Sequence, residues 1–186
     1  MSIKLAAFLG NPGPVYTHSR HNVGWLLAER NPILSYATWQ RKHKGLFTKV
    51  KDACFLKPET YMNVSGTAVQ SAAVFLKIQP EEILIVHDEL DLALGQVGFK
   101  FSGGLNGHNG LRSIKACLGS ADFWRLRIGI GRPERGEVID WVLSDFTAQE
   151  TPLLERVLEA SAAALNSAIE DGPEKLLPEW AKKCIE

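Results

Sequence analysis

Long hydrophobic runs, paired cysteines and an excess of charge of either sign are all missing from this sequence. No apolar stretch approaches the ~20 residues that a membrane helix needs, which predicts a protein with no membrane association. The three cysteines, Cys54, Cys117 and Cys184, lie far apart without a CxxC pair. This spacing favours reduced thiols in the cytoplasm over disulfides or a zinc site. The first apolar run stops at Asn11-Pro12-Gly13 after a single lysine, so we expect no signal peptide.

Several well-known catalytic and nucleotide-binding motifs are also absent. The chain has no GxxxxGK[ST] phosphate loop, no complete GxGxxG, no GxSxG nucleophile elbow, no HExxH and no EF-hand loop. If the protein is a hydrolase, these absences favour direct activation of water over a covalent ester on serine or cysteine.

The 186 residues, 45% of them hydrophobic and 23% charged, fit one globular domain spanning 1–186. Short apolar runs that indicate buried strands alternate with segments of helical periodicity. We expect strands near 3–9, 46–51, 53–57, 83–86, 97–101 and 126–130, and helices near 23–30, 64–77, 109–118, 151–170 and 174–183. This alternation predicts an α/β sandwich with a mixed, largely parallel twisted sheet and helices on both faces.

The zero net charge conceals a strong segregation of charge along the chain. Residues 41–57 carry six basic groups against one acid, and residues 96–135 carry seven against two. Residues 137–186 reverse the balance, with eleven acids against four bases. Each block could be an ordinary solvated face, but together they predict a polarised surface with one side suited to a polyanion such as nucleic acid.

Polar side chains follow three of the expected strands. Asn11 follows the first strand, Lys57 to Asn63 follow the strand at 53–57, and Asp88 follows the run at 83–86. Ligands of open α/β sheets bind beyond the carboxyl ends of the strands, so we expect these side chains to meet at one rim.

His21 lies in a loop and could be an ordinary structural or solvated histidine, but the carboxylates of the segment His87-Asp88-Glu89-Leu90-Asp91 offer it a partner for general base catalysis. An aspartate bonded to one ring nitrogen fixes the tautomer and raises the basicity of the other nitrogen, which then takes a proton from water. A metal site at His87, Asp88, Glu89 and Asp91 is the alternative. Neighbouring residues of a strand point to opposite faces, so this group does not converge while extended.

Six glycines between residues 95 and 110 precede an expected helix. They could form a mobile loop that needs positive φ angles. Alternatively, His108 and Asn109 lie at a helix N-terminus, where free N–H groups favour a carbonyl, carboxylate or phosphate oxygen. Asn109 is also an ordinary N-cap residue, and Asn63 could cap the next helix or donate to an oxyanion.

The order of five segments resembles the bacterial-type peptidyl-tRNA hydrolases. These segments are LGNPGPVYTHSRHNVG, KPETYMNVSG, VHDELDLALG, GGLNGHNGL and RLRIGIGRP, and the resemblance covers residues 3 to about 145. The resemblance implies an enzyme that hydrolyses the ester between a peptide and the 3′ end of tRNA, with no metal and no cofactor. It also implies a cytoplasmic monomer that recognises the acceptor stem and needs no protein partner.

The resemblance also implies roles for individual residues. His21 would be the general base, Asp88 would hold and polarise it, and Asn11 would bind the peptide side. Asn63 and Asn109 would position the 3′ adenosine, the carbonyl and the water. Two pairs complete the predicted site: Tyr16 and Tyr61 would flank the terminal nucleotide, and Lys100 and Arg127 would grip the tRNA 5′ phosphate.

The chain departs from the family pattern at Ser19, where threonine is usual, and at Asn106, where glycine is common. Its expected first helix is also short, so the region 25–45 is shortened relative to the family pattern. Two other functions stay open: a non-catalytic RNA-binding relative of the same fold, and a hydrolase of small esters, which would leave the basic blocks unexplained.

Overall fold

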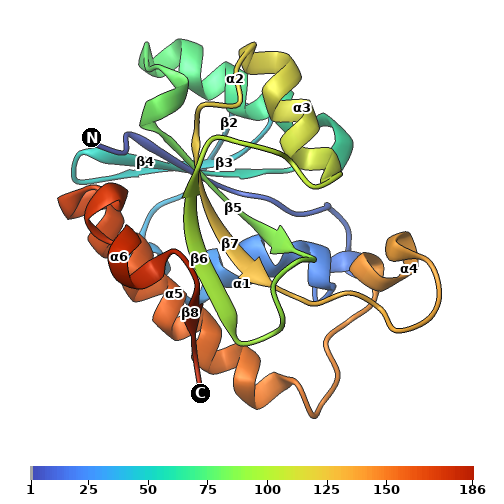
Figure 1. The fold of residues 1–186 in the computed structure, drawn as a ribbon. Coiled ribbons are helices and arrows are strands. Elements are labelled where there is room, and N and C mark those ends of the chain that lie inside the picture. The colour runs from blue at the N-terminus through green and yellow to red at the C-terminus, as the bar shows by residue number, and fades with distance from the viewer. Residues whose placement is uncertain (1) are drawn as a thin grey trace.

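Within residues 2–186, the part that the computed structural model describes, eight strands form one mixed sheet in the order β2-β3-β4-β1-β5-β7-β6-β8 (Figure 1). The four central strands β4, β1, β5 and β7 run parallel, and the pairs toward both edges are antiparallel. The expected α/β fold with a mixed sheet is confirmed. The strands are β1 (Leu5–Phe8), β2 (Gln40–Lys42), β3 (Gly45–Val50), β4 (Ala53–Pro58), β5 (Ile83–Glu89), β6 (Gln96–Phe101), β7 (Trp124–Gly129) and β8 (Lys183–Cys184).

Helices cover both faces of this sheet, as the sequence predicts (Figure 1). The helices α1 (Val23–Arg30) and α5 (Thr151–Asp171) share one core with Phe8, Val86 and Leu126. The helices α2 (Ser65–Leu76) and α3 (Asn109–Leu118) share the other core with Leu9 and Ile85. Both cores contact β1 and β5, which is why these strands are apolar on both sides and read as unbroken aliphatic runs.

Short helices connect the main elements. The 3₁₀ helices cover Pro14–Tyr16, Arg20–Asn22, Leu34–Tyr36, Met62–Val64, Pro80–Glu82 and Pro173–Lys175, and the short α-helices are α4 (Val138–Leu143) and α6 (Leu177–Trp180). None of the helices described between residues 2 and 186 is long and apolar enough to cross a membrane.

Two sequence predictions need correction. The predicted helix at 174–183 is wrong: the chain breaks into a 3₁₀ turn, the four-residue α6 and the edge strand β8, which pairs with Gln96 and Val97 of β6. The proline at position 178 allows only a first helical turn there. The strand predicted at 83–86 continues to Glu89, so His87 and Asp88 are part of β5 and do not follow it.

Candidate active site

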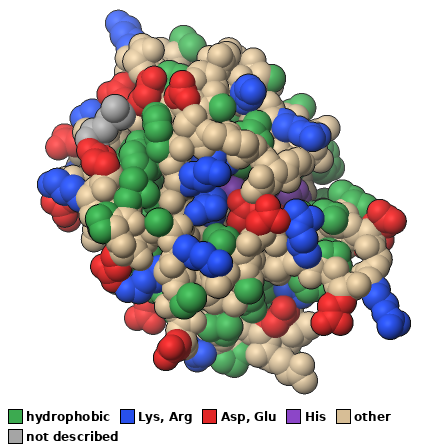
Figure 2. All heavy atoms as spheres, in the orientation of Figure 1, with side chains coloured by type: hydrophobic (Ala, Val, Ile, Leu, Met, Phe, Trp, Pro, Cys, Tyr) green, Lys and Arg blue, Asp and Glu red, His purple; other side chains and the backbone are tan. Residues whose placement is uncertain are grey.

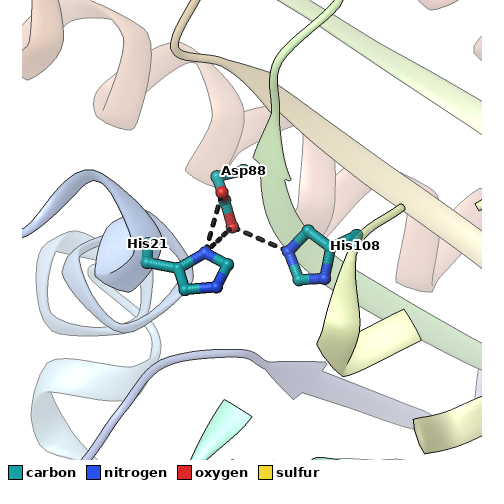
Figure 3. A group of neighbouring side chains, drawn as sticks. All are labelled: His21, Asp88 and His108. Atoms are coloured by element: carbon teal, nitrogen blue, oxygen red, sulfur yellow. Dashed lines mark hydrogen bonds and ion pairs between the residues drawn. The ribbon is translucent and has the colours of Figure 1, made fainter. Parts of the chain in front are cut away.

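Two histidines from distant parts of the chain bond the same carboxylate (Figure 3). His21 Nδ1 lies 2.9 Å from both carboxylate oxygens of Asp88, and His108 Nε2 lies 2.8 Å from Oδ1. The side chains of all three residues are less than one-tenth exposed. The predicted pairing of His21 with Asp88 is therefore present in the fold, and His108 is a second partner that the sequence prediction did not include.

The three residues come together because the carboxyl end of β5 and the N-termini of α1 and α3 lie at the same rim of the sheet. Asp88 lies near the carboxyl end of β5, and His21 lies in the 3₁₀ turn Arg20–Asn22 that leads into α1. His108 is the N-cap of α3, where its Nδ1 accepts the backbone N–H groups of Gly110 and Leu111 at 3.1 and 3.4 Å. The interpretation of Asn109 as the N-cap is wrong, because Asn109 is the first residue inside the helix.

These bonds determine where the imidazole protons lie. Nδ1 of His108 accepts from the helix, so its proton is on Nε2 and is donated to Asp88. An ionised carboxylate only accepts, so Nδ1 of His21 donates to Asp88 as well. Nε2 of His21 is then unprotonated and points away from Asp88, as a general base requires (Figure 3).

The electrostatics of the pair follow from burial and mutual charge. Burial by itself would lower the pKa of His21, but the charge of Asp88 and its hydrogen bond outweigh burial and raise that pKa. Burial would raise the pKa of the Asp88 carboxyl, but both histidines and their hydrogen bonds hold it far below the usual range. Asp88 is therefore ionised at neutral pH.

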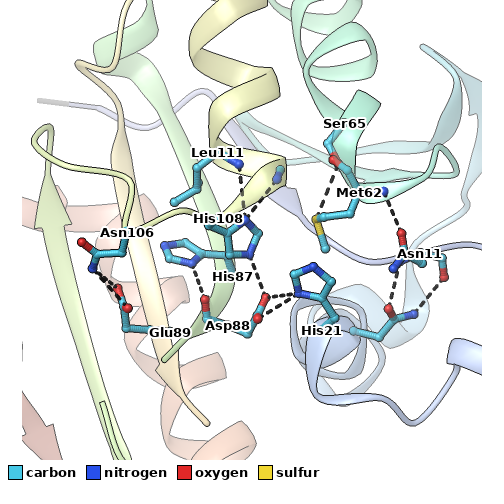
Figure 4. Close-up of polar contacts among 12 residues, drawn as sticks. Asn11, His21, Met62, Ser65, His87, Asp88, Glu89, Asn106, His108 and Leu111 are labelled. Carbon is cyan, nitrogen blue, oxygen red and sulfur yellow. Dashed lines mark hydrogen bonds and ion pairs between the residues drawn. The ribbon is translucent and has the colours of Figure 1, made fainter. Parts of the chain in front are cut away.

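His87 lies on the opposite side of β5 from Asp88 and has a different environment. It is fully buried, its Nδ1 donates to the backbone oxygen of Asp88 at 2.7 Å, and its ring packs against His108 (Figure 4). Burial lowers the pKa of His87 well below the usual value, because a charge on the fully buried ring would lose its hydration. His87 is consequently a neutral packing residue.

His87, Asp88, Glu89 and Asp91 do not form a metal site, because the alternation of side chains along β5 separates His87 from Asp88. Among residues 2–186, the group whose donor atoms could hold an ion together is His21, Asp88 and His108, with ligand atoms within 4.8 Å of one another. The same atoms form the hydrogen bonds of the pair of histidines with Asp88, so a metal ion would compete with those bonds.

Asn11 is held in a separate hydrogen-bond network beside this cluster (Figure 4). Its backbone exchanges two hydrogen bonds of 2.9 Å with the side chain of Asn22, and its side-chain oxygen accepts the N–H of Met62 at 2.7 Å. Because the oxygen is engaged, Asn11 presents its amide N–H groups as the donors for a ligand. The network also ties the loop after β1 to the turn that bears His21.

Asn63 and Tyr61 flank Met62, and both side chains are exposed at the surface. Asn109 lines the same cavity as His21, and Tyr16 is half-buried at the end of the 3₁₀ turn Pro14–Tyr16. The fold thus gathers the segments that carry the predicted site around the rim.

A cavity of about 150 Å³ opens beside the cluster. Its lining includes His21, Asp88 and His108 together with apolar residues, among them Val138, Ile139 and Val142 of α4.

Lys100 and Arg127 lie on the adjacent strands β6 and β7, and Arg127 is the register partner of His87 on β5. Gly98 of β6 pairs with Arg127 of β7, and Lys100 is two residues further along the same face. Lys100 is ~10 Å along the sheet from the level of Asp88, at 3.3 Å per residue. Figure 2 shows Lys and Arg side chains gathered over this part of the sheet, next to a histidine at the bottom of a hollow.

Arg125 is a further residue that the sequence prediction missed. It is buried, and its guanidinium donates to the backbone oxygens of Ser102 and Gly104 in the glycine-rich segment. Asn106 in the same segment donates to the Glu89 carboxylate (Figure 4). The glycine-rich segment, which the sequence allowed to be a mobile loop, is thus attached to β7 and β5.

The role of His108 as a helix cap had one signal in the sequence, namely its position directly before the helix expected at 109–118.

Comparisons with known proteins identify the family of the chain. The family model for peptidyl-tRNA hydrolase matches residues 5–185. The peptidyl-tRNA hydrolase of Trichlorobacter lovleyi is 43% identical over 182 residues, which cover 95% of this chain and 94% of that protein. The one from Delftia acidovorans is 46% identical over 169 residues, covering 87% and 82%. The crystal structure of the Acinetobacter baumannii enzyme superposes with a TM-score of 0.87 at 34% identity, covering 95% of this chain and 93% of that one. The chain belongs to the peptidyl-tRNA hydrolase family.

Proposed function

We propose that this protein hydrolyses the ester that joins a peptide to the 3′ end of tRNA and so releases stalled peptidyl-tRNA for reuse. The observation that carries the proposal is the arrangement of His21, Asp88 and His108, in which a buried carboxylate holds one histidine with a free Nε2 at the edge of a cavity. A relative that only bound RNA would not need that arrangement.

In the proposed reaction, Nε2 of His21 takes a proton from water as the water oxygen attacks the ester carbonyl. The amide groups of Asn11, Asn63 and Asn109 donate hydrogen bonds to the substrate, and those aimed at the carbonyl oxygen stabilise the charge that develops there. The tetrahedral intermediate collapses by breaking the bond to the ribose oxygen, which receives the proton from His21. Asp88 stabilises the imidazolium between these two proton transfers.

The RNA part of the substrate is assigned to the rest of the predicted site. Tyr16 and Tyr61 flank the terminal adenosine, because an aromatic ring can stack on a base. Lys100 and Arg127 hold the 5′ phosphate of the acceptor stem, in keeping with their position on one face of two adjacent strands. We further propose that residues 1–186 act as a single domain and a cytoplasmic monomer, in agreement with three free cysteines and one continuous sheet.

The experiment compares N-acetyl-aminoacyl-tRNA with the same tRNA carrying a free amino group, both with EDTA present. We expect rapid release from the blocked substrate alone, and loss of ~10²–10⁴-fold in turnover for His21→Ala with tRNA affinity nearly unchanged. Binding of tRNA without release by the wild-type protein would instead favour the non-catalytic RNA-binding function. Full activity of His21→Ala would contradict the mechanism.

A further inference from the structure

Helix α4 forms one wall of the cavity but has little packing of its own. It is six residues long, Val142 is its only buried residue, and Ile139 is 55% exposed. Val142 belongs to neither of the two cores. Helices this short are not stable by themselves, so the position of α4 must come from contacts to other parts of the chain.

Arg20 supplies the largest set of these contacts. Its guanidinium is 2% exposed and donates two hydrogen bonds of 2.9 Å to the carboxylate of Glu150. It also donates to the hydroxyl of Ser144 at 3.2 Å and stacks on the Trp141 ring at 3.7 Å from the ring centroid. One planar cation thus connects a residue of α4, the end of α4 and the start of α5 (Thr151–Asp171).

The backbone around Arg20 adds to this connection. The N–H of Arg20 donates to the backbone oxygen of Ser144 at 2.9 Å, and Ser19 pairs with Asp145 in an antiparallel bridge. Partial burial would raise the pKa of Glu150, but the hydrogen bonds from Arg20 and Thr147 outweigh it and keep this carboxylate ionised. The next residue after Arg20 is His21, so the turn that bears the general base also holds α4 (Figure 1).

We infer that Arg20 is a positioning residue that holds the apolar wall of α4 in the cavity beside His21, so that the wall meets the side chain of the residue esterified to tRNA. This inference rests on the proposed hydrolysis of peptidyl-tRNA. Val138, Ile139 and Val142 line the same cavity as His21 and Asp88, so an ester bound beside His21 would bring that side chain to them. Arg20 acts through α4 and contacts no reacting atom.

Arg20→Lys tests the inference because lysine keeps the charge but has no planar fork for Glu150 and no flat face for Trp141. The matched control is Arg30→Lys. Arg30 makes a similar fork to Glu155, with two bonds of 3.0 Å, but it joins α1 to α5 and lies about half exposed. Both variants are assayed on N-acetyl-leucyl-tRNA and N-acetyl-glycyl-tRNA, each relative to wild type on the same substrate, so that differences between the tRNAs cancel.

We expect Arg20→Lys to reduce kcat/KM for the leucyl substrate ~10- to 100-fold, since small displacements of positioning groups have effects of this size. The loss on the glycyl substrate should be several-fold smaller, because glycine has no side chain to meet the wall. Amide hydrogen exchange over 138–143 should accelerate, while the acid limb of the pH profile stays in place. Arg30→Lys should match wild type on both substrates.

Equal losses on the two substrates, or unchanged exchange over 138–143, would overturn the inference. If Arg20→Lys does not fold, Glu150→Gln replaces it, because this substitution weakens the pair of hydrogen bonds between Arg20 and residue 150. It is judged by the same two measurements, the losses on the two substrates and the exchange over 138–143. Hydrogen exchange separates this inference from the proposed function. A wild-type protein that releases neither peptide would refute the proposed function. Even then, faster amide exchange over 138–143 in Arg20→Lys, but not in Arg30→Lys, would show that Arg20 stabilises α4.

Discussion

Replacing Asp88 by asparagine tests the arrangement of the two histidines most directly. The amide keeps the size of the carboxylate but has one acceptor and one donor end. His108 must donate through Nε2, because its Nδ1 is held by the N–H groups of the α3 terminus. The amide oxygen of the variant therefore takes the place of Oδ1, which lies near both histidines, and its NH₂ group takes the place of Oδ2, 2.9 Å from Nδ1 of His21.

This orientation places the proton of His21 on the wrong nitrogen. An NH₂ group at that distance opposes a proton on Nδ1 and favours one on Nε2, so the tautomer that can take a proton from water is disfavoured. The expected loss is most of the general-base contribution, ~10²–10⁴-fold in kcat, or about 3–5 kcal/mol at 1.36 kcal/mol for each factor of ten. The activity should remain above that of His21→Ala, because a minority of the correct tautomer persists.

A second substitution separates this explanation from a general loss of charge. Asparagine at position 108 still caps α3 but is too short to reach residue 88. In the double variant Asp88→Asn, His108→Asn the amide oxygen can turn to His21, so we expect kcat to recover about tenfold over Asp88→Asn alone, the worth of one good hydrogen bond. The single variant His108→Asn is the matched control and should lose less activity than Asp88→Asn.

Single-turnover release of N-acetyl-aminoacyl-tRNA across a pH series measures all four proteins. The removal of the Asp88 charge leaves burial to lower the pKa of His21, so the acid limb of Asp88→Asn should move to lower pH. A double variant no more active than Asp88→Asn would refute the tautomer reasoning. An acid limb that does not move would refute the electrostatic pairing.

Three further outcomes are expected. The base must be neutral to act, and Asp88 raises the pKa of His21, so the acid limb of the wild-type profile should lie above 6.5; a midpoint below that value would contradict the raised pKa. Because folding raises the pKa of His21, protonation of His21 stabilises the folded protein. This stabilisation is fully present below the pKa of His21 in the unfolded chain, and it is lost as the pH rises through the pKa of His21 in the folded protein. Thermal unfolding should therefore show that the difference between wild type and His21→Asn narrows as pH rises. Lys100→Ala should raise KM more than it lowers kcat and should flatten the dependence of kcat/KM on salt, since phosphate contacts release counterions; a flat salt dependence of the wild type would favour the hydrolase of small esters.

Stability depends on one close approach between α2 and α3. A Cβ at Gly66 would lie 2.1 Å from the backbone oxygen of Ser113, while the Gly66 N–H donates to the hydroxyl of that residue. Gly66→Ala should reduce the free energy of unfolding by ~1–3 kcal/mol in urea denaturation, although alanine is the better helix former. Thr67→Ala, at the next and half-buried position, is the control, and equal stability of the two variants would show that the helices can separate at low cost.

The apolar patterning of the chain was sufficient to predict most of the fold. Strands such as β5 (Ile83–Glu89) are buried on both sides, so their aliphatic runs are visible without the structure. The amphipathic period of α5 and the glycine that ends α3 are equally local signals. The predictions failed at β8 and α4, because these short elements are stabilised by pairing with β6 and by Arg20 and have no pattern of their own.

The candidate site also has a part that the sequence predicted and a part that only the tertiary structure shows. The residue types of a general base and its carboxylate, His21 and Asp88, were identifiable from the sequence, and the fold brings them together. The strand order decided that they meet, since β1 and β5 are neighbours although 75 residues separate Phe8 from Ile83. The role of His108 required the tertiary structure, because only the contact between the α3 terminus and the end of β5 fixes its tautomer and directs its proton to Asp88. Sequence spacing specifies local structure, but the direction of a hydrogen bond between distant segments depends on how they pack.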